Sequence, residues 1–203
     1  MDQTVANAAA AHPVRPHPER HSELPGDELA ALTPAGRMVM TTDGTVTAIL
    51  AHAVGERIVL GGTEQHLLAV AAPAAGHLRL PVGAPVELRT VQLVGERTGT
   101  RYVRAETVVS TAALPPAFRE DLARGAETIG RLLRAHRLET YREVVDVQVA
   151  EAEGTCRRTY TVSAGGVPVL LITEHFEATC RFLPVGLPAQ ARRGAARAAT
   201  GPA

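Results

Sequence analysis

The sequence predicts an α+β fold in which helices pack on one face of a single antiparallel β-sheet. Three strand candidates, at residues 141–149, 156–162 and 167–176, follow one another through short turns, which is typical of antiparallel pairing. Residues 86–94 and 102–109 form a hairpin-like pair around a Glu-Arg-Thr-Gly turn. Helical segments occur in blocks between these strand groups, and this distribution favours an antiparallel sheet over an alternating parallel one.

The first helix is expected at about residues 46–53. The Thr-Asp pair at 42–43 can cap it, apolar residues recur at helical spacing, and Gly55 is a natural C-terminal stop. Two short strand candidates follow, at residues 57–60 and 65–72. The second candidate is the weaker one because alanine is a poor strand former.

Two helices are expected between the hairpin and the last three strands. The sequence Leu114-Pro-Pro opens the first of them, since Pro is tolerated in the first turn, and Gly125 ends it. The second helix, at about residues 128–136, would bury Ile129 and two leucines on one face. Gly165-Gly166 then predicts a tight hairpin turn before the last strand.

One domain, at residues 29–186, is expected to hold all of these elements, and a chain of 203 residues can bury a proper core. Residues 1–28 are rich in Ala, Pro and His without a period, so they predict a flexible N-terminal arm. The Ala/Arg-rich residues 187–203 predict a flexible C-terminal tail. The sequence shows no internal repeat.

The composition disfavours several classes of partner. Lys+Arg and Asp+Glu are both 21, so the formal net charge is zero, whereas nucleic-acid binders normally carry a basic excess. Aromatic residues make up only 3%, which leaves few platforms for stacking bases. No apolar run approaches the length of about 20 residues that a membrane span needs, and the N-terminus lacks a signal-peptide pattern.

Cys156 and Cys180 are the two cysteines of the chain, and their spacing matches no zinc or redox motif. We expect both thiols to be reduced, a disulfide between them being the less favoured alternative. Together with the composition, this predicts a cytoplasmic protein with no nucleic-acid or membrane partner and no metal. The expected oligomeric state is a monomer or a small homo-oligomer.

Glu174 is the most informative residue of the chain. Alternation along the strand at 167–176 places it on one face with Leu170, Ile172 and Phe176, where it is the only charge. A lone carboxylate among apolar neighbours is unfavourable unless a partner compensates it. Glu174 is therefore either half of a structural ion pair or part of a site, and the residues alone weigh these two about equally.

Of the arginines on predicted strands, Arg89, Arg142 and Arg158 are the candidates to pair with Glu174 or to form a site with it. Arg142 looks the more exposed of the three, because Asp and Gln share its strand face. Guanidinium groups bind carboxylates in bidentate fashion, and a Glu can hold or titrate a hydroxyl group. Several arginines and one carboxylate in a cleft between sheet and helices would suit a small polyanion that also carries a hydroxyl group.

Four segments, spread over about residues 32–176, resemble the chorismate lyases (4-hydroxybenzoate synthases). Residues 42–50 (TDGTVTAIL) are similar to that family's T-D-(G)-S-L-T helix start, and residues 87–94 (ELRTVQLV) to its L-R-E strand. Residues 127–133 (ETIGRLL) are similar to its P-L-G-R-x-L helix, and residues 167–176 (VPVLLITEHF) to its K-P-L-L-L-T-E-x-F strand.

The resemblance implies a cofactor-free lyase of aromatic biosynthesis, with the chorismate lyase fold, that eliminates pyruvate from chorismate to give 4-hydroxybenzoate. Carried over by position, Arg89 would bind the ring carboxylate and Glu174 would meet the 4-hydroxyl group. Ile129 and Gly130 would form the pocket wall. The remaining anchor, for the enolpyruvyl carboxylate, is expected to be Arg158, with Arg142 as the second candidate.

One departure places the chain in a divergent branch. Glu106 stands where the ubiquinone-pathway enzymes carry an arginine in a G-R-T-V strand, and Arg104 on the same strand face could compensate for it. Glu106 could also favour a cationic substituent on the substrate. A lyase acting on an amino-substituted chorismate in a specialised pathway is therefore an alternative.

Two further alternatives belong to other functional classes. The same fold serves as a non-catalytic effector-binding domain attached to helix-turn-helix regulators, so the chain could be an aromatic-acid-binding sensor. It could also be a small interaction domain whose arginines form solvated ion pairs. Release of pyruvate from chorismate would separate the lyases from both of these alternatives.

Overall fold

The computed structural model describes residues 29–30, 32–150, 153–178 and 180. The predicted arm at residues 1–28 and the predicted tail at residues 187–203 lie outside these residues, so the domain boundaries stay predictions.

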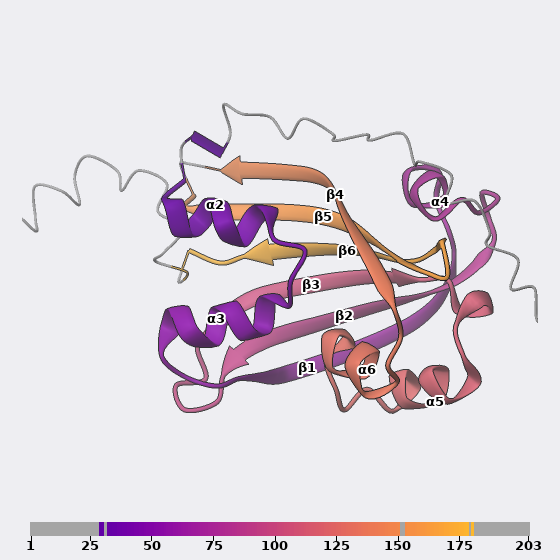
Figure 1. Cartoon of the computed structure of the whole chain (residues 1–203), viewed down its shortest axis with the longest axis horizontal. Helices are drawn as coiled ribbons and strands as arrows, with labels where there is room; N and C mark the ends of the chain where they lie inside the picture. The colour runs from indigo at the N-terminus through magenta and orange to yellow at the C-terminus, as the bar shows by residue number, and fades with distance from the viewer. Residues whose placement is uncertain (1–28, 31, 151–152, 179, 181–203) are drawn as a thin grey trace, which may run out of the picture.

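Six strands form one sheet in the order β1-β2-β3-β6-β5-β4, and all neighbouring strands are antiparallel (Figure 1). This confirms the predicted α+β fold. The strands are β1 (Ile58–Ala69), β2 (Pro85–Gly95), β3 (Arg101–Val109), β4 (Thr140–Ala150), β5 (Thr155–Ala164) and β6 (Val167–Phe176). The helices are α2 (Pro34–Thr41), α3 (Val46–Val54), α4 (Ala72–Leu78), α5 (Pro116–Arg124) and α6 (Ile129–Ala135), with a short 3-10 turn at Thr111–Ala113.

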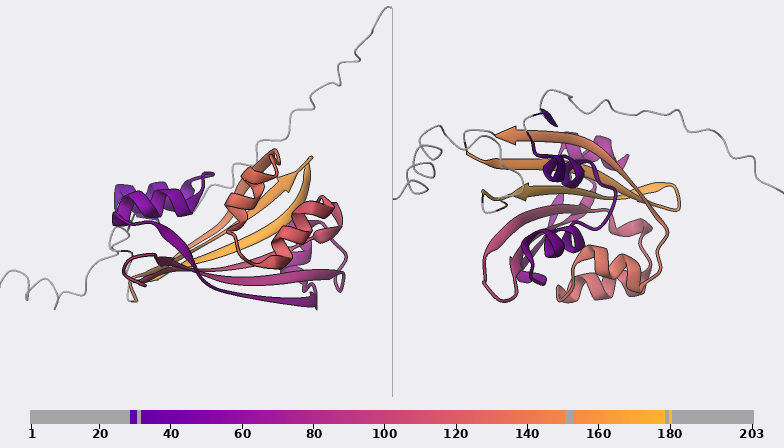
Figure 2. Two further views of the ribbon diagram at one scale, coloured as in Figure 1. Left: turned by 90° about the horizontal axis from the view of Figure 1, so that it is seen from below. Right: turned by 60° about the vertical axis from the view of Figure 1, so that its left-hand side comes forward.

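Helices α2, α3, α5 and α6 cover the same face of the sheet, as the sequence predicts (Figure 2). Helix α4 lies on the other face at one end, where Ala75 packs with Val70 and Val86. Side chains alternate along β2, so Val86 points to the side opposite to Arg89. The part of the sheet that carries Arg89 therefore faces the main helical layer.

The order of the elements repeats once along the chain. Two helices and three antiparallel strands (α2-α3-β1-β2-β3, interrupted by α4) are followed by the same series (α5-α6-β4-β5-β6). The two three-stranded halves join where β3 pairs with β6. The structure thus contains a repeat that the sequence does not reveal.

Several elements differ from the sequence-based expectation. Helix α2 was not expected, although Thr33 caps it by accepting a hydrogen bond from the Gly36 N–H at 3.0 Å and a proline stands in its first turn. Helix α4 was also not expected. The two short strand candidates form one continuous β1, in which a register shift between Leu60 and Gly62 absorbs the glycines. Thr45, rather than the Thr-Asp pair, directly precedes α3.

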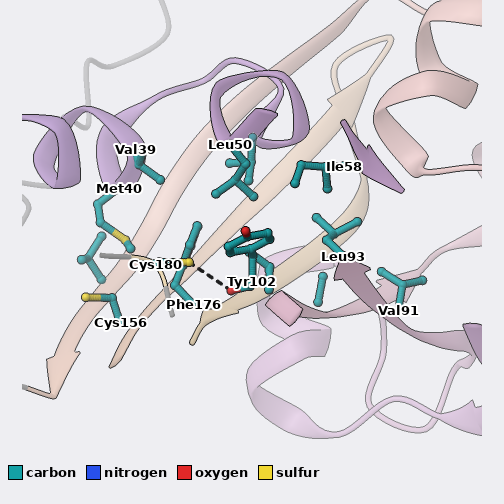
Figure 3. Packing of buried hydrophobic residues seen from close by; sticks show 14 of the residues in the cluster. Val39, Met40, Leu50, Ile58, Val91, Leu93, Tyr102, Cys156, Phe176 and Cys180 are labelled. Carbon is teal, nitrogen blue, oxygen red and sulfur yellow. Dashed lines mark hydrogen bonds between the residues drawn. The ribbon is translucent and has the colours of Figure 1, made fainter. Parts of the chain in front are cut away.

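The sheet packs against its helices through two large hydrophobic clusters. One cluster lies under α2 and α3 and includes Met40, Leu50 and Phe176 (Figure 3). The other lies under α5 and α6 and includes Phe118 and Leu170.

Both cysteines are buried as free thiols in the first cluster. Burial raises the pKa of Cys156 to about 11 and the pKa of Cys180 to about 12. The thiol of Cys180 donates a hydrogen bond to the carbonyl of Tyr102 at 3.2 Å (Figure 3). Both cysteines therefore act as protonated packing residues.

Glu56 ties the end of α3 to the β2–β3 hairpin. Its carboxylate accepts hydrogen bonds from the Thr98 hydroxyl at 2.8 Å, from the Tyr102 hydroxyl at 2.9 Å, and from the backbone N–H groups of Arg97 and Thr98. These bonds, led by the one from the Thr98 hydroxyl, lower the pKa of Glu56 although partial desolvation opposes them. The interaction needs the ionised carboxylate.

Glu56→Gln is therefore expected to lower the melting temperature near neutral pH but to matter little in acid. A carboxyl group whose pKa is lower in the folded protein than in the unfolded chain stabilises the fold fully above its unfolded-state pKa of about 4.3. This stabilisation is lost as the pH falls through the folded-state pKa. Thermal unfolding of both proteins from about pH 7 to about pH 3 tests this. Glu96→Gln, an exposed carboxylate on the same hairpin, is the control. A gap between wild type and Glu56→Gln that stays constant with pH would contradict the assignment.

Candidate active site

The described residues form a cavity between the sheet and the helical layer. Its sheet side is built from residues of β2, β3, β6, β5 and β4, namely Arg89, Val91, Leu93, Ala105, Thr107, Ile172, Glu174, Tyr160 and Arg142. Its helical side is built from the starts of α3 and α6, namely Gly44, Thr45, Val46, Thr47, Thr128, Ile129 and Gly130.

Strand register explains why these side chains meet. Arg89 pairs with Thr107 across β2 and β3, and Ala105 pairs with Glu174 across β3 and β6. Directly paired residues share a face, and residues two apart on a strand do the same. Arg89 and Glu174 therefore point into one cavity, separated by two strand spacings of about 4.8 Å each.

Arg89 is almost completely buried, with 1% of its surface exposed. Its Nη2 donates a hydrogen bond to the carbonyl of Glu127 at 2.7 Å, while its Nε has no partner among the described residues. Burial lowers the pKa of Arg89, and the nearby carboxylate of Glu87 opposes that shift. A buried guanidinium with an unused donor is unfavourable in isolation, so Arg89 is poised to receive an anion.

Glu174 is both ion-paired and part of the cavity, with 5% of its surface exposed. Its Oε2 accepts a hydrogen bond from the Nε of Arg158 at 2.7 Å, and its Oε1 accepts one from the Tyr160 hydroxyl at 3.1 Å. The structural ion pair that the sequence offered as one interpretation is therefore present, and the same carboxylate also lines the cavity.

Of the two candidate anchors for the enolpyruvyl carboxylate, Arg142 lines the cavity and Arg158 does not. Arg158 does not line the cavity, and besides Glu174 it binds the carbonyls of Val39 and Thr42 through Nη1 at 2.6 and 3.0 Å. Arg142 does line the cavity, and its Nε has no partner among the described residues although its Nη1 donates to the carbonyl of Asp43. These placements favour Arg142 over Arg158 as a second anion anchor.

Glu106 and Arg104 do not reach the cavity. Ala105 between them lines it, so alternation directs both neighbours to the opposite face of the sheet. There they form an ion pair with each other at 2.8 Å. The expectations that Arg104 compensates for a missing site arginine and that Glu106 selects a cationic substituent are therefore wrong.

Tyr160 and the threonines at the two helix starts were not predicted from the sequence as cavity residues. Tyr160 is 8% exposed, and the guanidinium carbon of Arg158 lies 4.9 Å from its ring centroid. Burial, aided by the charge of Glu174, raises the pKa of Tyr160, so its hydroxyl stays a donor. Its position two residues after Arg158 on the same strand face is the signal that could have identified it.

A second, more open recess adjoins the cavity. It shares Thr45, Gly130 and Arg142 with the cavity and adds Arg134 and Arg137, and no acidic residue lines it. Positive charge on this side favours the approach of an anionic ligand. Within the described residues there is no group of three or more side chains suited to a metal ion, and no helix has the length and apolarity to cross a membrane.

The chain is similar in sequence to a known family and to proteins with assigned names. The model of the family described as "Chorismate pyruvate-lyase Rv2949c-like" matches residues 40–183. A chorismate pyruvate-lyase of Mycobacterium leprae is 30% identical over 166 residues, which cover 75% of this chain and 79% of the relative. One from Mycobacterium tuberculosis (strain CDC 1551) is 24% identical over 169 residues, covering 75% and 84%.

A solved structure, PhnF from Mycobacterium smegmatis, shares the fold. It superposes with a TM-score of 0.50 and 18% sequence identity, over 68% of this chain and 66% of that one. The family match extends over most of the chain and contains every charged residue of the cavity. By sequence and by fold, this chain is a member of the Rv2949c-like chorismate pyruvate-lyase family.

Proposed function

We propose that the protein eliminates pyruvate from chorismate to give 4-hydroxybenzoate, without a cofactor. The observation that carries this proposal is the placement of buried Arg89 and Glu174 in one cavity of a chain from a chorismate pyruvate-lyase family. Chorismate is the small-molecule partner in this proposal, and the cytoplasm is the proposed place of action.

Each charged group has a role in holding the dianionic substrate. Arg89 binds the ring carboxylate through its unused donor, and Arg142 binds the enolpyruvyl carboxylate through its own. Glu174 accepts a hydrogen bond from the ring hydroxyl group. The first turn of α3 also faces the cavity, and the positive end of the helix dipole there favours a bound anion.

The reaction itself is an elimination on the ring. The ether bond between ring carbon and enolpyruvyl oxygen breaks, the oxygen keeps the electron pair, and the ring carbon that bears the hydroxyl loses its proton. The enolpyruvate then becomes pyruvate. Formation of the aromatic ring makes the step favourable, so the protein contributes mainly by orienting the substrate and by stabilising charge as it develops.

The direct test is incubation of the full-length protein with chorismate. We expect equal amounts of pyruvate, measured with lactate dehydrogenase, and 4-hydroxybenzoate, measured by chromatography. Tight binding of 4-hydroxybenzoate without pyruvate would favour the sensor instead. Faster pyruvate release from an amino-substituted chorismate than from chorismate would favour the alternative lyase function. Glu106 no longer supports that alternative, because its side chain lies outside the cavity.

Gly130→Ala is expected to weaken 4-hydroxybenzoate binding about tenfold while keeping the protein at least as stable. A Cβ at this position would lie 3.1 Å from Cγ2 of Thr45, closer than an ordinary contact, so the Thr45 side chain at the cavity wall would have to shift. Alanine is meanwhile favoured over glycine in a helix by about 1 kcal/mol. Titration calorimetry and thermal unfolding measure the two effects.

Gly76→Ala in α4 is the matched control, because a Cβ there meets nothing within 4 Å and α4 lies away from the cavity. It should leave binding unchanged. Unchanged binding in Gly130→Ala as well would show that Gly130 does not shape the ligand site.

A further inference from the structure

The carboxylate of Glu174 is held entirely from one strand. Among the described residues, both of its hydrogen-bond donors, Arg158 and Tyr160, belong to β5. We propose that Arg158 and Tyr160 are positioning residues that keep Glu174 ionised and fix the direction of its carboxylate. The inference rests on the proposed lyase function for its kinetic consequences, but not for its electrostatic ones.

Arg158 is fixed without any ligand. Its side chain is 1% exposed and divides its donors between Glu174 and the carbonyls of Val39 and Thr42. These carbonyls lie at the C-terminal end of α2, where unpaired C=O groups carry partial negative charge. The charge of Arg158 is thus balanced on two sides, so its position does not depend on substrate.

Tyr160 holds the second carboxylate oxygen. Its hydroxyl binds Oε1 while Arg158 binds Oε2, so each oxygen of Glu174 has one donor and the carboxylate cannot rotate freely. A carboxylate oxygen offers two lone pairs, which leaves one on Oε1 for a ligand hydroxyl group. Stacking of Arg158 over the Tyr160 ring makes the two donors one unit.

The charged side chains around Glu174 are all arginines. The titratable groups around it are Arg158 and Tyr160 from β5, Arg142 from β4 and Arg89 from β2. The cavity residues of β3, α3 and α6 carry no titratable side chain, and no second carboxylate lines the cavity. Removal of Arg158 would leave a desolvated carboxylate with weaker support, which favours its protonated form.

The kinetic test uses Tyr160→Phe, Arg158→Gln and the conservative Arg158→Lys, with kcat and KM measured from about pH 5 to about pH 9. Tyr160→Phe should lower kcat about tenfold or more with KM changed by less than about twofold. The acidic limb of kcat should move to higher pH in Arg158→Gln, by more than about one unit, and less in Tyr160→Phe. Arg158→Lys should return the limb toward wild type.

Tyr141→Phe is the matched control, because Tyr141 is 69% exposed on β4 and does not line the cavity. It should change neither kcat nor the pH profile. A folded Arg158→Gln protein with the wild-type acidic limb would overturn the proposal. If Arg158→Gln does not fold, the Tyr160→Phe variant is the test. A wild-type kcat and a wild-type acidic limb in Tyr160→Phe would then overturn the proposal.

An infrared measurement tests the charge state independently of turnover. We expect a protonated-carboxyl band near neutral pH in Arg158→Gln that is absent from wild type and from the Arg158→Gln/Glu174→Gln double variant. The band in Arg158→Gln, combined with a wild-type protein that releases no pyruvate from chorismate, would uphold this inference and reject the proposed function. A wild-type protein with lyase activity, combined with an Arg158→Gln protein that lacks the band, would uphold the function and reject the inference.

Discussion

Replacing Arg89 by alanine is expected to reduce kcat/KM for chorismate by about 10²- to 10³-fold while the protein remains folded. Truncating one partner of a buried, hydrogen-bonded charge pair costs about 2–5 kcal/mol of binding, and here the lost partner is the anchor of the ring carboxylate. In the free protein Arg89 has no ion-pair partner within 4 Å among the described residues, and its Nε is unsatisfied. Its removal breaks no ion pair among these residues, so the protein should remain folded.

The matched control is Arg104→Ala on the neighbouring strand β3. Arg104 is exposed on the opposite face of the sheet and pairs with Glu106, so its loss should leave kcat/KM at the wild-type value. Steady-state kinetics together with thermal unfolding distinguish the two variants. Full activity of Arg89→Ala would reject Arg89 as the anchor of the ring carboxylate.

Glu174→Gln is expected to lower kcat by about 10²- to 10³-fold with a modest change in KM. A positioned carboxylate that assists proton movement contributes about 10²- to 10⁴-fold to a rate, whereas glutamine keeps the shape and can still hydrogen-bond a hydroxyl group. The change also leaves the buried guanidinium of Arg158 without its carboxylate. Because breaking a buried ion pair costs about 3–5 kcal/mol, the melting temperature should fall as well.

Glu106→Gln is the control for this substitution, since Glu106 is a carboxylate on the outer face of the same sheet. Kinetics should be measured below the melting temperature of Glu174→Gln, with folding checked by circular dichroism. A lower melting temperature combined with an unchanged kcat would mean that Glu174 is only a structural ion pair.

The buried faces of β2 and β6 could be predicted from the sequence, but the register between strands could not. Alternation places Arg89 on one face with Val91 and Glu174 on one face with Ile172, so both charged side chains share a face with apolar residues. The pairing of Arg158 with Glu174 depends on a one-residue register shift between Val162 and Ser163. Without that shift, the pairing that begins at Ala164 and Val167 would place Arg158 opposite Thr173. Thr173 lies on the face of β6 that is opposite to Glu174.

Arg142 is half-buried and so more exposed than Arg89 and Arg158, as predicted, but a second register shift changes which residues share its strand face. Read as one regular strand, Arg142 shares its face with Asp146. The shift between Val144 and Asp146 moves the later residues to the other face, so Arg142 joins Val147 on the cavity side. Shifts of this kind depend on the fit of the two strands and leave no mark in the residue pattern.

The partners of Arg158 on α2 were equally inaccessible to sequence reasoning. Its acceptors at Val39 and Thr42 are backbone carbonyls, which every residue possesses, so no side-chain type reveals them. The family motifs found four of the residues that line the cavity, namely Arg89, Ile129, Gly130 and Glu174. The strand register and the helix end that fix those groups appear only in three dimensions.

The repeated order of elements gives the cavity one further property. The first half of the chain contributes Arg89 and the start of α3, and the second half contributes Glu174, Arg142 and the start of α6. Within the described sheet, the two halves share backbone pairing along one ladder, between β3 and β6. A dianion bound at this seam acts as a non-covalent cross-link, so occupancy should make the two halves unfold as a single cooperative unit.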